Sequence, residues 1–332
     1  MAVRVRVASG SGFDLLMAAA AVADPDWRTV FDAGQQSWES ARRAGGSALL
    51  RDAARFGRFG WINLASLLVG ERGAVSSARL RELVERTTPD ELHLLLIGGR
   101  RRELATALDA AVLRDAAAGQ TAAVRAVRAA VDAEGSLSQV APWLLRTHSE
   151  EVHGACRRVL DALPEPPSDD DAARRLRTAL RSATAENVLA VVAPGVRYGS
   201  DALHQVVLVP TVHVAPVIVV IDEVRRSLIL HPPLGPDGEE STHVDLGRLG
   251  KAMGDTTRMA ILAELRPGPR RLAELCTALD SPRTTLLHHL ALLRAAGLIE
   301  ITVPAAGPNV YTVSSQGFER LAVLARDFLR SS

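Results

Sequence analysis

The sequence predicts an α+β protein that is mainly helical and has two parts. The first is a long N-terminal helical domain with a small strand-rich part at its end. The second is a short C-terminal domain of helices and a hairpin. Apolar residues recur at helical spacing over most of the 332 residues, whereas β-branched residues gather only at 204–231 and near the C-terminal end. Between the two parts lies "PPLGPDGEES", residues 232–241, a Pro/Gly/acid stretch without periodicity.

Composition favours a globular protein in a reducing compartment. The hydrophobic content is 47%, which is typical of soluble globular chains, and the length allows two or three cores. Cys156 and Cys276 are the only two cysteines and lie far apart, so a disulfide framework is not expected. We therefore expect a soluble, cytoplasmic protein.

The N-terminus imitates a secretory signal, since Arg4 and Arg6 precede "LLMAAAAVA". However, Asp14 stands directly before that run of apolar residues, and "VRVRVA" alternates like a strand. The other long apolar run, 206–221, contains two prolines and a histidine and is shorter than the ~20 residues that a membrane span needs. We expect a strand and a core helix here, and no membrane segment.

These patterns predict two domains joined by a linker: an N-terminal domain at 1–231 (helical to ~193, strand-rich at 204–231), the linker at 232–241, and a C-terminal domain at 242–332. Within the first, Thr88 caps a helix that has Pro89 at its first position and Glu91 to close a capping box. The strands at 204–231 are expected to pair with "VRVRVA". The stretch 149–163 has helical apolar spacing.

Charge differs between the parts. The net charge is +1 overall, but residues 242–332 carry 11 basic against 8 acidic residues, a net of +3. The remainder carries 28 basic against 30 acidic residues, a net of −2. A weak overall charge does not favour a strong non-specific grip on DNA, yet the positive excess lies in the smaller part.

The C-terminal domain contains two short helices joined by a tight turn. A helix that begins near Thr242 continues through "GDTTRMAILAEL", and "RRLAELCTALD" predicts a second. Ser281 as N-cap and Pro282 at the first position then begin a helix at 282–296. Its inward face holds Leu286, His289, Leu290 and Leu293, with His289 packed against the preceding helix. The outward side holds Thr284, Leu287 and His288.

This pair of helices is a helix-turn-helix. Segments 298–303 and 310–313 flank a Pro/Gly/Asn turn and predict a hairpin, the wing. A last helix follows, with Phe318, Leu321, Leu324, Ala325 and Phe328 on one side.

Several motifs in order carry a family resemblance: "GD-x-TR-x-x-IL", "LAEL", "T-x-x-x-HHL-x-x-LR-x-AGL" and "VY". Over roughly residues 245–329 the chain resembles the winged helix-turn-helix domain of ArsR-type bacterial transcriptional repressors, and the long N-terminal part is similar to that of some longer regulators of the family. The resemblance implies a homodimer, built on the first and last helices of the domain, that binds double-stranded operator DNA.

Three positions depart from the family pattern. Thr256 stands where proline is usual, and Ala278 stands where a metalloid site would need a second cysteine beside Cys276. The wing turn "PAAGPN" has no lysine or arginine, which argues against a wing contact with the minor groove. We expect no metal and no cofactor.

The DNA contacts are predicted from residue chemistry. Arg283 at the start of the recognition helix suits a bidentate contact with guanine. Thr284 suits a thymine methyl group or a phosphate, Leu287 a thymine methyl group, and His288 a base or a phosphate. Thr285 and the helix N-terminus suit phosphate. Arg270 and Arg271 are expected to reach the DNA backbone. The interface thus consists of Arg270, Arg271, Ser281, Arg283, Thr284, Thr285, Leu287 and His288.

The N-terminal domain carries no strong chemical motif. His148, His153 and Cys156 lack metal-site spacing and indicate surface histidines and a core cysteine. His204 and His213 lie in strand-like sequence, where they could pair across a hairpin, but solvated side chains are the expectation. This domain is expected to sense a small-molecule effector or to extend the dimer.

Three functional hypotheses remain. The first is a dimeric DNA-binding transcriptional regulator, a repressor, with no enzyme activity. The alternatives are a winged helix that binds protein, suggested by the uncharged wing and by Leu287, and an enzyme in residues 1–231 with a DNA-tethering tail.

Overall fold

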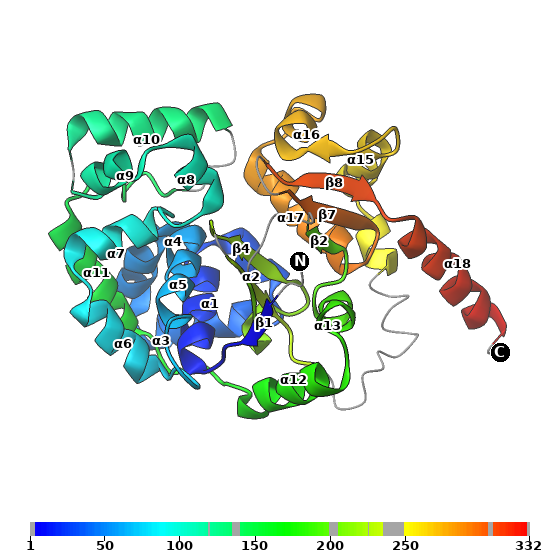
Figure 1. The fold of residues 1–332 in the computed structure, drawn as a ribbon, viewed down its shortest axis with the longest axis horizontal. Helices are drawn as coiled ribbons and strands as arrows, with labels where there is room; N and C mark the ends of the chain where they lie inside the picture. Colours follow the sequence, from blue (N-terminus) through cyan, green and yellow to red (C-terminus); the bar gives the residue numbers. More distant parts are fainter. Residues whose placement is uncertain are drawn as a thin grey trace. The chain divides into compact units, whose positions relative to one another are not determined.

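The computed structural model describes residues 4–118, 120–134, 140–198, 205–224, 226–234, 249–304 and 308–330. The chain forms two compact units (Figure 1). The larger unit contains Arg4–Thr178 and His204–Pro233, and the smaller contains Ala179–Leu203 and Leu234–Ser332. Both combine helices with a four-stranded sheet, so the predicted α+β, mainly helical class is confirmed.

The division differs from the predicted one in one segment. The break at Pro233/Leu234 lies within the predicted linker, but Ala179–Leu203 belongs to the C-terminal unit and not to the N-terminal one. The reason is a short strand at Val196–Tyr198 that pairs with the wing, far away in sequence.

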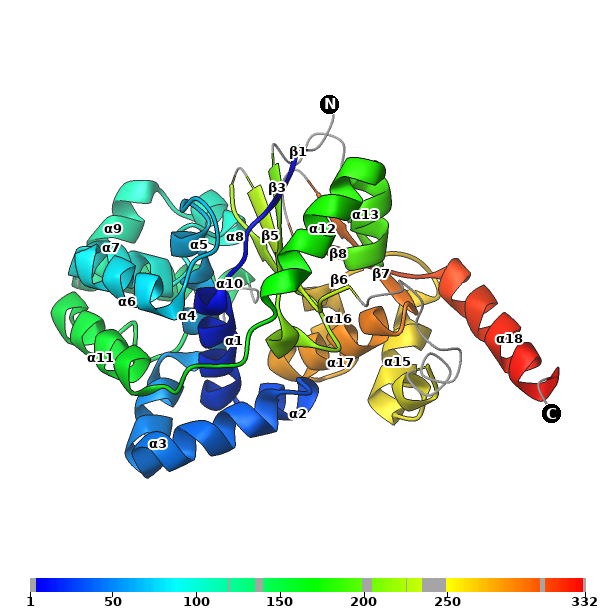
Figure 2. The same ribbon diagram turned by 90° about the horizontal axis from the view of Figure 1, so that it is seen from below.

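The sheet of the larger unit consists of β1 (Arg4–Val7), β3 (Gln205–Pro210), β4 (Val219–Asp222) and β5 (Arg226–His231) in the order β1-β3-β5-β4. β1 pairs parallel with β3, with Val5 opposite Val206, so the predicted pairing of the N-terminal strand is confirmed. Figure 2 shows β1 beside β3, leading into the first helix. β4 alone runs antiparallel, next to β5.

Helices fill the sequence between β1 and β3. Helix α1 (Ser11–Ala23) contains the apolar run that imitates a secretory signal. It is a core helix, because side chains along it are at most 1% exposed: Phe13, Leu15, Leu16 and Met17. The structure shows, over the residues that it describes, no helix long and apolar enough to cross a membrane. The other helices of this region are α2 (Pro25–Val30), α3 (Gly34–Arg55), α4 (Gly57–Asn63), α5 (Ala65–Leu68), α6 (Ser77–Arg86), α7 (Pro89–Leu96), α8 (Arg102–Ala107), α9 (Ala110–Ala117), α10 (Thr121–Glu134), α11 (Ser149–Ala162), α12 (Asp170–Ser182) and α13 (Ala185–Val192).

Two of these helices follow the predicted local signals. The Thr88 hydroxyl accepts a hydrogen bond from the Glu91 N–H at 3.4 Å and caps α7, which begins at Pro89. In α11 the predicted stripe is buried, with Val152, Cys156 and Leu160 at 0% exposure. A short 3-10 turn, η1 (Val212–Val214), follows β3.

The C-terminal unit is a winged helix-turn-helix with an extra strand. A helical segment at 249–253 precedes α15 (Thr256–Leu265), and the predicted start near Thr242 lies outside the described residues. Then come β6 (Arg270–Arg271), α16 (Leu272–Ala278), α17 (Arg283–Ala295), β7 (Ile299–Val303), β8 (Val310–Val313) and α18 (Ser315–Arg330). The sheet order is β2-β7-β8-β6, where β2 is Val196–Tyr198.

The last helix differs in its packing from the rest of this unit. In Figures 1 and 2, α18 leaves the end of β8 and extends away from α15, α16 and α17. Phe318, Leu321 and Leu324 are only partly buried, against the core that the other helices form. The side chain of Phe328 lies outside the described residues.

Candidate nucleic-acid interface

The helix-turn-helix is built from α16 and α17. Helix α16 begins at Leu272, where the Glu274 carboxylate accepts the Arg271 N–H at 2.7 Å. The residues expected to begin this helix, Arg270 and Arg271, instead form β6 and pair antiparallel with Tyr311 and Val310 of β8. The strand pairing fixes both basic residues beside the wing.

The turn between the helices depends on Asp280. Its φ of 42° lies in the left-handed region that few non-glycine residues adopt, and aspartate is among those that tolerate it. The Ser281 N–H donates to the Cys276 carbonyl at 3.2 Å. Ser281 is therefore part of the end of α16, and the prediction that it caps α17 is wrong. Pro282 stands at the cap position and α17 begins at Arg283.

The inward face of α17 is as predicted. Leu286, Leu290 and Leu293 are at most 2% exposed and belong to the core of the unit. His289 also faces inward, with a side chain 12% exposed. Its polar neighbours lie on α15 and its cap; the expected packing of its ring against α16 stays a prediction.

His289 completes a polar junction with Asp255 and Arg258. The His289 Nδ1 lies 3.5 Å from Arg258 Nη1 and 3.7 Å from an Asp255 carboxylate oxygen. Burial lowers the pKa of His289, opposed by the Asp255 carboxylate and assisted by the Arg258 charge. The Arg258 guanidinium also donates to the carbonyls of Lys251 and Ala252 at 2.7 and 2.6 Å. The junction therefore ties segment 249–253, α15 and α17 together.

The predicted reading residues lie at the first turns of α17. Arg283, Thr285 and His288 are half-buried, and the His288 ring stands edge-on to His289 with 5.4 Å between ring centroids. The side chain of Thr284 lies outside the described residues. Leu287 is partly buried against the core, so less of its surface is open than an outward position implies.

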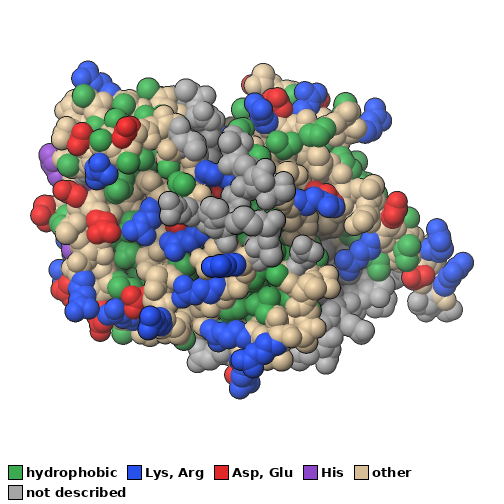
Figure 3. Space-filling view, viewed as in Figure 1, with side chains coloured by type: hydrophobic (Ala, Val, Ile, Leu, Met, Phe, Trp, Pro, Cys, Tyr) green, Lys and Arg blue, Asp and Glu red, His purple; other side chains and the backbone are tan. Residues whose placement is uncertain are grey.

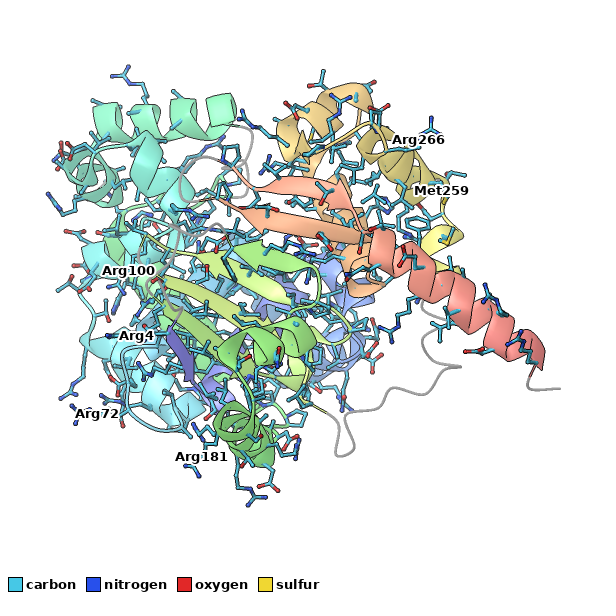
Figure 4. The ribbon with its side chains drawn as sticks, turned by 45° about the vertical axis from the view of Figure 1, so that its right-hand side comes forward. Arg4, Arg72, Arg100, Arg181, Met259 and Arg266 are labelled. Carbon is cyan, nitrogen blue, oxygen red and sulfur yellow. The ribbon has the colours of Figure 1, made fainter. Side chains whose placement is uncertain are left out.

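Basic side chains lie on the strand and turn that precede α16. Arg271 is exposed, and Arg270, whose side chain is 41% exposed, is 3.9 Å from Glu264. The exposed Arg266 at the end of α15, which the sequence analysis did not single out, points outward in Figure 4. Figure 3 shows basic side chains over this part of the unit. Arg266, Arg270 and Arg271 thus place three basic side chains in the segment that leads into α16.

The wing is the predicted hairpin. β7 and β8 pair antiparallel, with Ile299 opposite Val313, while the turn residues 305–307 lie outside the described residues. The outer edge of β7 is covered by β2, which the sequence did not reveal as part of this unit. Arg197 of β2 donates two hydrogen bonds to the Glu300 carboxylate, at 2.6 and 2.9 Å. These bonds hold the pKa of Glu300 below its usual range, opposed by burial.

The cysteines and histidines weighed as metal ligands have other surroundings. Cys276 is partly buried against the core, and burial raises its thiol pKa. His153 Nε2 lies 3.0 Å from the Val84 carbonyl, and burial raises the pKa of Cys156. His213 is 3% exposed in η1 and 3.0 Å from the Pro167 carbonyl, so its predicted solvation is wrong. His204 lies outside the described residues. Throughout the described ranges, no three His, Cys, Asp or Glu residues are arranged to hold a metal ion.

Comparison with known proteins agrees with this geometry. A family model described as a helix-turn-helix domain matches residues 253–302. The match extends from the end of segment 249–253 through α17 and most of β7. No curated protein matches the chain. The chain therefore carries a C-terminal helix-turn-helix domain, of the kind that suggests a DNA-binding regulator.

Proposed function

We propose that the protein is a DNA-binding transcriptional regulator of the ArsR type that places α17 in the major groove. The observation that carries this proposal is that one face of α17 is buried in the core while the side chains of its first turn lie outside that core. Leu286, Leu290 and Leu293 fix the helix, while Arg283 and Thr285 stand at its N-terminal end. Helix-turn-helix proteins read base edges with this end of the second helix.

Arg283 is the side chain with the right chemistry for base reading, because its planar fork matches O6 and N7 of guanine. Arg270 and Arg271 supply phosphate contacts from β6, and Arg266 adds a third cation. Phosphate contacts set the register of the protein on the duplex without reading sequence. Thr285 and the backbone N–H groups at the start of α17 add to the phosphate contacts.

We further propose a homodimer through segment 249–253 and α18. Helix α18 has an apolar side that its own unit covers only in part, since Phe318, Leu321 and Leu324 remain half-buried. Covering that side against a second copy removes apolar surface from water. Two copies then present two α17 helices to two half-sites, which is the arrangement of dimeric readers.

The larger unit is proposed to sense an effector or to extend the dimer, and the regulator is proposed to repress. A groove between α6 and α11 is lined by Arg81, Glu85, Arg157 and Asp161. These charges pair with each other, with Arg157 at 2.8 Å from Glu85 and Arg81 at 3.9 Å from Asp161. The groove therefore does not name an effector.

We propose that the chain is not an enzyme. Two buried groups of the larger unit that are suited to acid–base chemistry contact other parts of the chain. Asp14, 3% exposed, accepts a hydrogen bond from the Thr211 hydroxyl, and His213 lies beside the Pro167 carbonyl. The alternative hypothesis, a winged helix that binds protein, loses part of its support, because Leu287 is partly buried.

The test is binding of the purified chain to the DNA upstream of its own gene and to a scrambled duplex of equal length. Fluorescence anisotropy over about 50–300 mM salt measures both affinities. For a phosphate-binding protein log Kd rises linearly with the logarithm of the salt concentration, and the slope is proportional to the number of phosphates neutralised. We expect tighter binding to the upstream DNA and a steep slope. Equal, salt-independent binding to both duplexes contradicts the proposal.

A further inference from the structure

The fourth strand of the winged helix comes from outside the matched domain. β2 runs parallel to β7, with Val196 opposite Ile301 and Tyr198 opposite Val303. The Ile301 N–H donates to the Gly195 carbonyl at 2.6 Å. The two exposed hydrogen bonds from Arg197 to Glu300 add a side-chain tether on the same edge. β2 therefore closes the edge of the wing that the hairpin leaves open.

The approach of β2 requires glycine at position 195. Its φ is +74°, in the left-handed region that glycine adopts without cost. A Cβ at this position would lie 2.8 Å from the Ile299 carbonyl oxygen and 3.4 Å from Cγ of Arg294. The distance to Ile299 is too short for a real contact, so a larger residue at 195 must move the backbone of β2 away from β7, whereas the approach to Arg294 is an ordinary van der Waals contact.

The contact with α17 is made at Arg294. This residue stands in the last turn of the helix and is 3% exposed. Tyr198 of β2 and Tyr311 of β8 lie within electrostatic range of its guanidinium, and burial lowers its pKa to about 10. The guanidinium is still charged at neutral pH, and hydration favours its exposure to water if β2 detaches from β7. Its place under β2 thus holds the C-terminal end of α17.

The chain reaches β2 through short, regular elements. Helix α12 crosses from the larger unit to the smaller at Thr178/Ala179, and only Ala183 and Thr184 separate α12 from α13. Thr184 caps α13 by accepting the Asn187 N–H at 3.2 Å, and the Val196 N–H donates to the Ala193 carbonyl at the other end. No long loop interrupts the path from α12 to β2.

We propose that β2 is a positioning strand for DNA reading: through Arg294 it sets the orientation of α17, and it gives the N-terminal unit a route to the recognition helix. The inference rests on the proposed function and deepens it. Arg294 and Tyr198 are positioning residues, because neither lies among the first turns of α17 that face DNA. The strand is the path by which a change in the larger unit alters operator affinity.

Gly195→Ala in the full chain tests the inference, with Gly73→Ala as the matched control. Gly73 has a similar φ of +84°, but a Cβ there meets nothing within 4 Å. Amide hydrogen exchange at Ile301 measures attachment of β2, and anisotropy with the upstream and scrambled duplexes measures discrimination. We expect Gly195→Ala to raise Ile301 exchange about tenfold and to lower discrimination about fivefold, and Gly73→Ala to change neither beyond about twofold.

Arg294→Met is the second variant, because replacing a buried charge by an apolar side chain of similar length often leaves a fold intact. We expect it to lose discrimination about fivefold while the melting temperature is kept. If β2 detaches in Gly195→Ala, or residue 294 is made neutral, and discrimination stays at the wild-type level, the inference is overturned while the proposed function stands. A wild-type chain that prefers neither duplex overturns the proposed function, and the inference falls with it.

Discussion

His231 makes the stability of the larger unit depend on pH. It ends β5, its side chain is 0% exposed, and its Nδ1 lies 2.7 Å from the Pro232 carbonyl oxygen, as for a donating Nδ1–H. Burial lowers the pKa of His231 from 6.5 to about 4, opposed by the hydrogen bond to Pro232. The folded protein therefore keeps this ring neutral at pH values where the unfolded chain takes up a proton.

The sign and size follow from proton linkage. Because the pKa of His231 is lower in the folded state, its contribution to stability is complete above pH 6.5 and is lost as the pH falls towards 4. Binding of one proton with these two pKa values reduces the free energy of unfolding by about 2 kcal/mol between pH 7 and pH 5. Well below pH 4 the difference stays constant, because His231 is then protonated in both the folded and the unfolded state.

The assay is urea unfolding at pH 7 and pH 5 of the wild type and of His231→Asn, whose amide replaces the donor to Pro232 but does not titrate. Trp27, Trp38, Trp61 and Trp143 all lie in the larger unit, so tryptophan fluorescence follows that unit. We expect the wild type to lose about 2 kcal/mol more than the variant between the two pH values. Equal losses refute the reasoning.

The pH window separates His231 from the carboxylates with shifted pKa values. Hydrogen bonds lower the pKa of Asp255 and Glu300 below their ordinary values of 3.8 and 4.5. In the larger unit, burial raises the pKa of Glu165, but its hydrogen bonds outweigh burial and the pKa lies below the ordinary 4.5. The contributions of these carboxylates to stability are therefore lost mainly below pH 5. The pKa of His289 is lowered as well, so its contribution to stability is also lost as the pH falls, but it lies in the C-terminal unit, whereas all four tryptophans lie in the larger one.

Three further outcomes are expected. Arg283→Ala costs about 1–3 kcal/mol of binding to the upstream duplex and relaxes base preference, and an equal loss on scrambled DNA removes its reading role. Arg270→Ala weakens both duplexes alike and lowers the salt slope by about one; a loss confined to the upstream duplex contradicts a phosphate contact. Leu324→Glu converts dimers to monomers in light scattering, whereas Val323→Glu, at a 49% exposed site on the same helix, does not; dimers that survive Leu324→Glu exclude α18 from the interface.

The features that the sequence predicted best are those with a local period. The 3.6-residue repeat placed Leu286, His289, Leu290 and Leu293 on one face of α17, and all four face inward. Alternation in "VRVRVA" predicted β1, and β-branched runs predicted β3 and the wing. Each signal lies within a few residues of the element that it specifies.

The features that it missed are set by contacts distant in sequence. β2 is three residues long and joins a partner 103 positions away through Arg197 and Glu300, and a segment that short has no period to detect. Gly195 was a signal in principle, because an isolated glycine before a strand indicates close backbone approach. The burial of His213 likewise depends on the distant Pro167 carbonyl.

Errors at the helix-turn-helix itself have a local cause. Ser281 and Pro282 are good residues for the start of a helix, but the left-handed Asp280 ends α16 in a conformation that uses the Ser281 N–H. The start of α17 moves by one residue as a result. Leu287 appeared outward by helical angle alone, although its long side chain reaches the core.

The most direct test of the central claim, that α17 reads the major groove, is base substitution in the upstream duplex. Replacing guanine by 7-deazaguanine removes the major-groove N7 acceptor, and replacing it by inosine removes the minor-groove amino group. We predict that 7-deazaguanine at one or two positions weakens binding of the wild type. The same replacement does not further weaken the binding of Arg283→Ala, and inosine has little effect on the wild type. Loss of binding with inosine alone would place the reading in the minor groove and contradict the account.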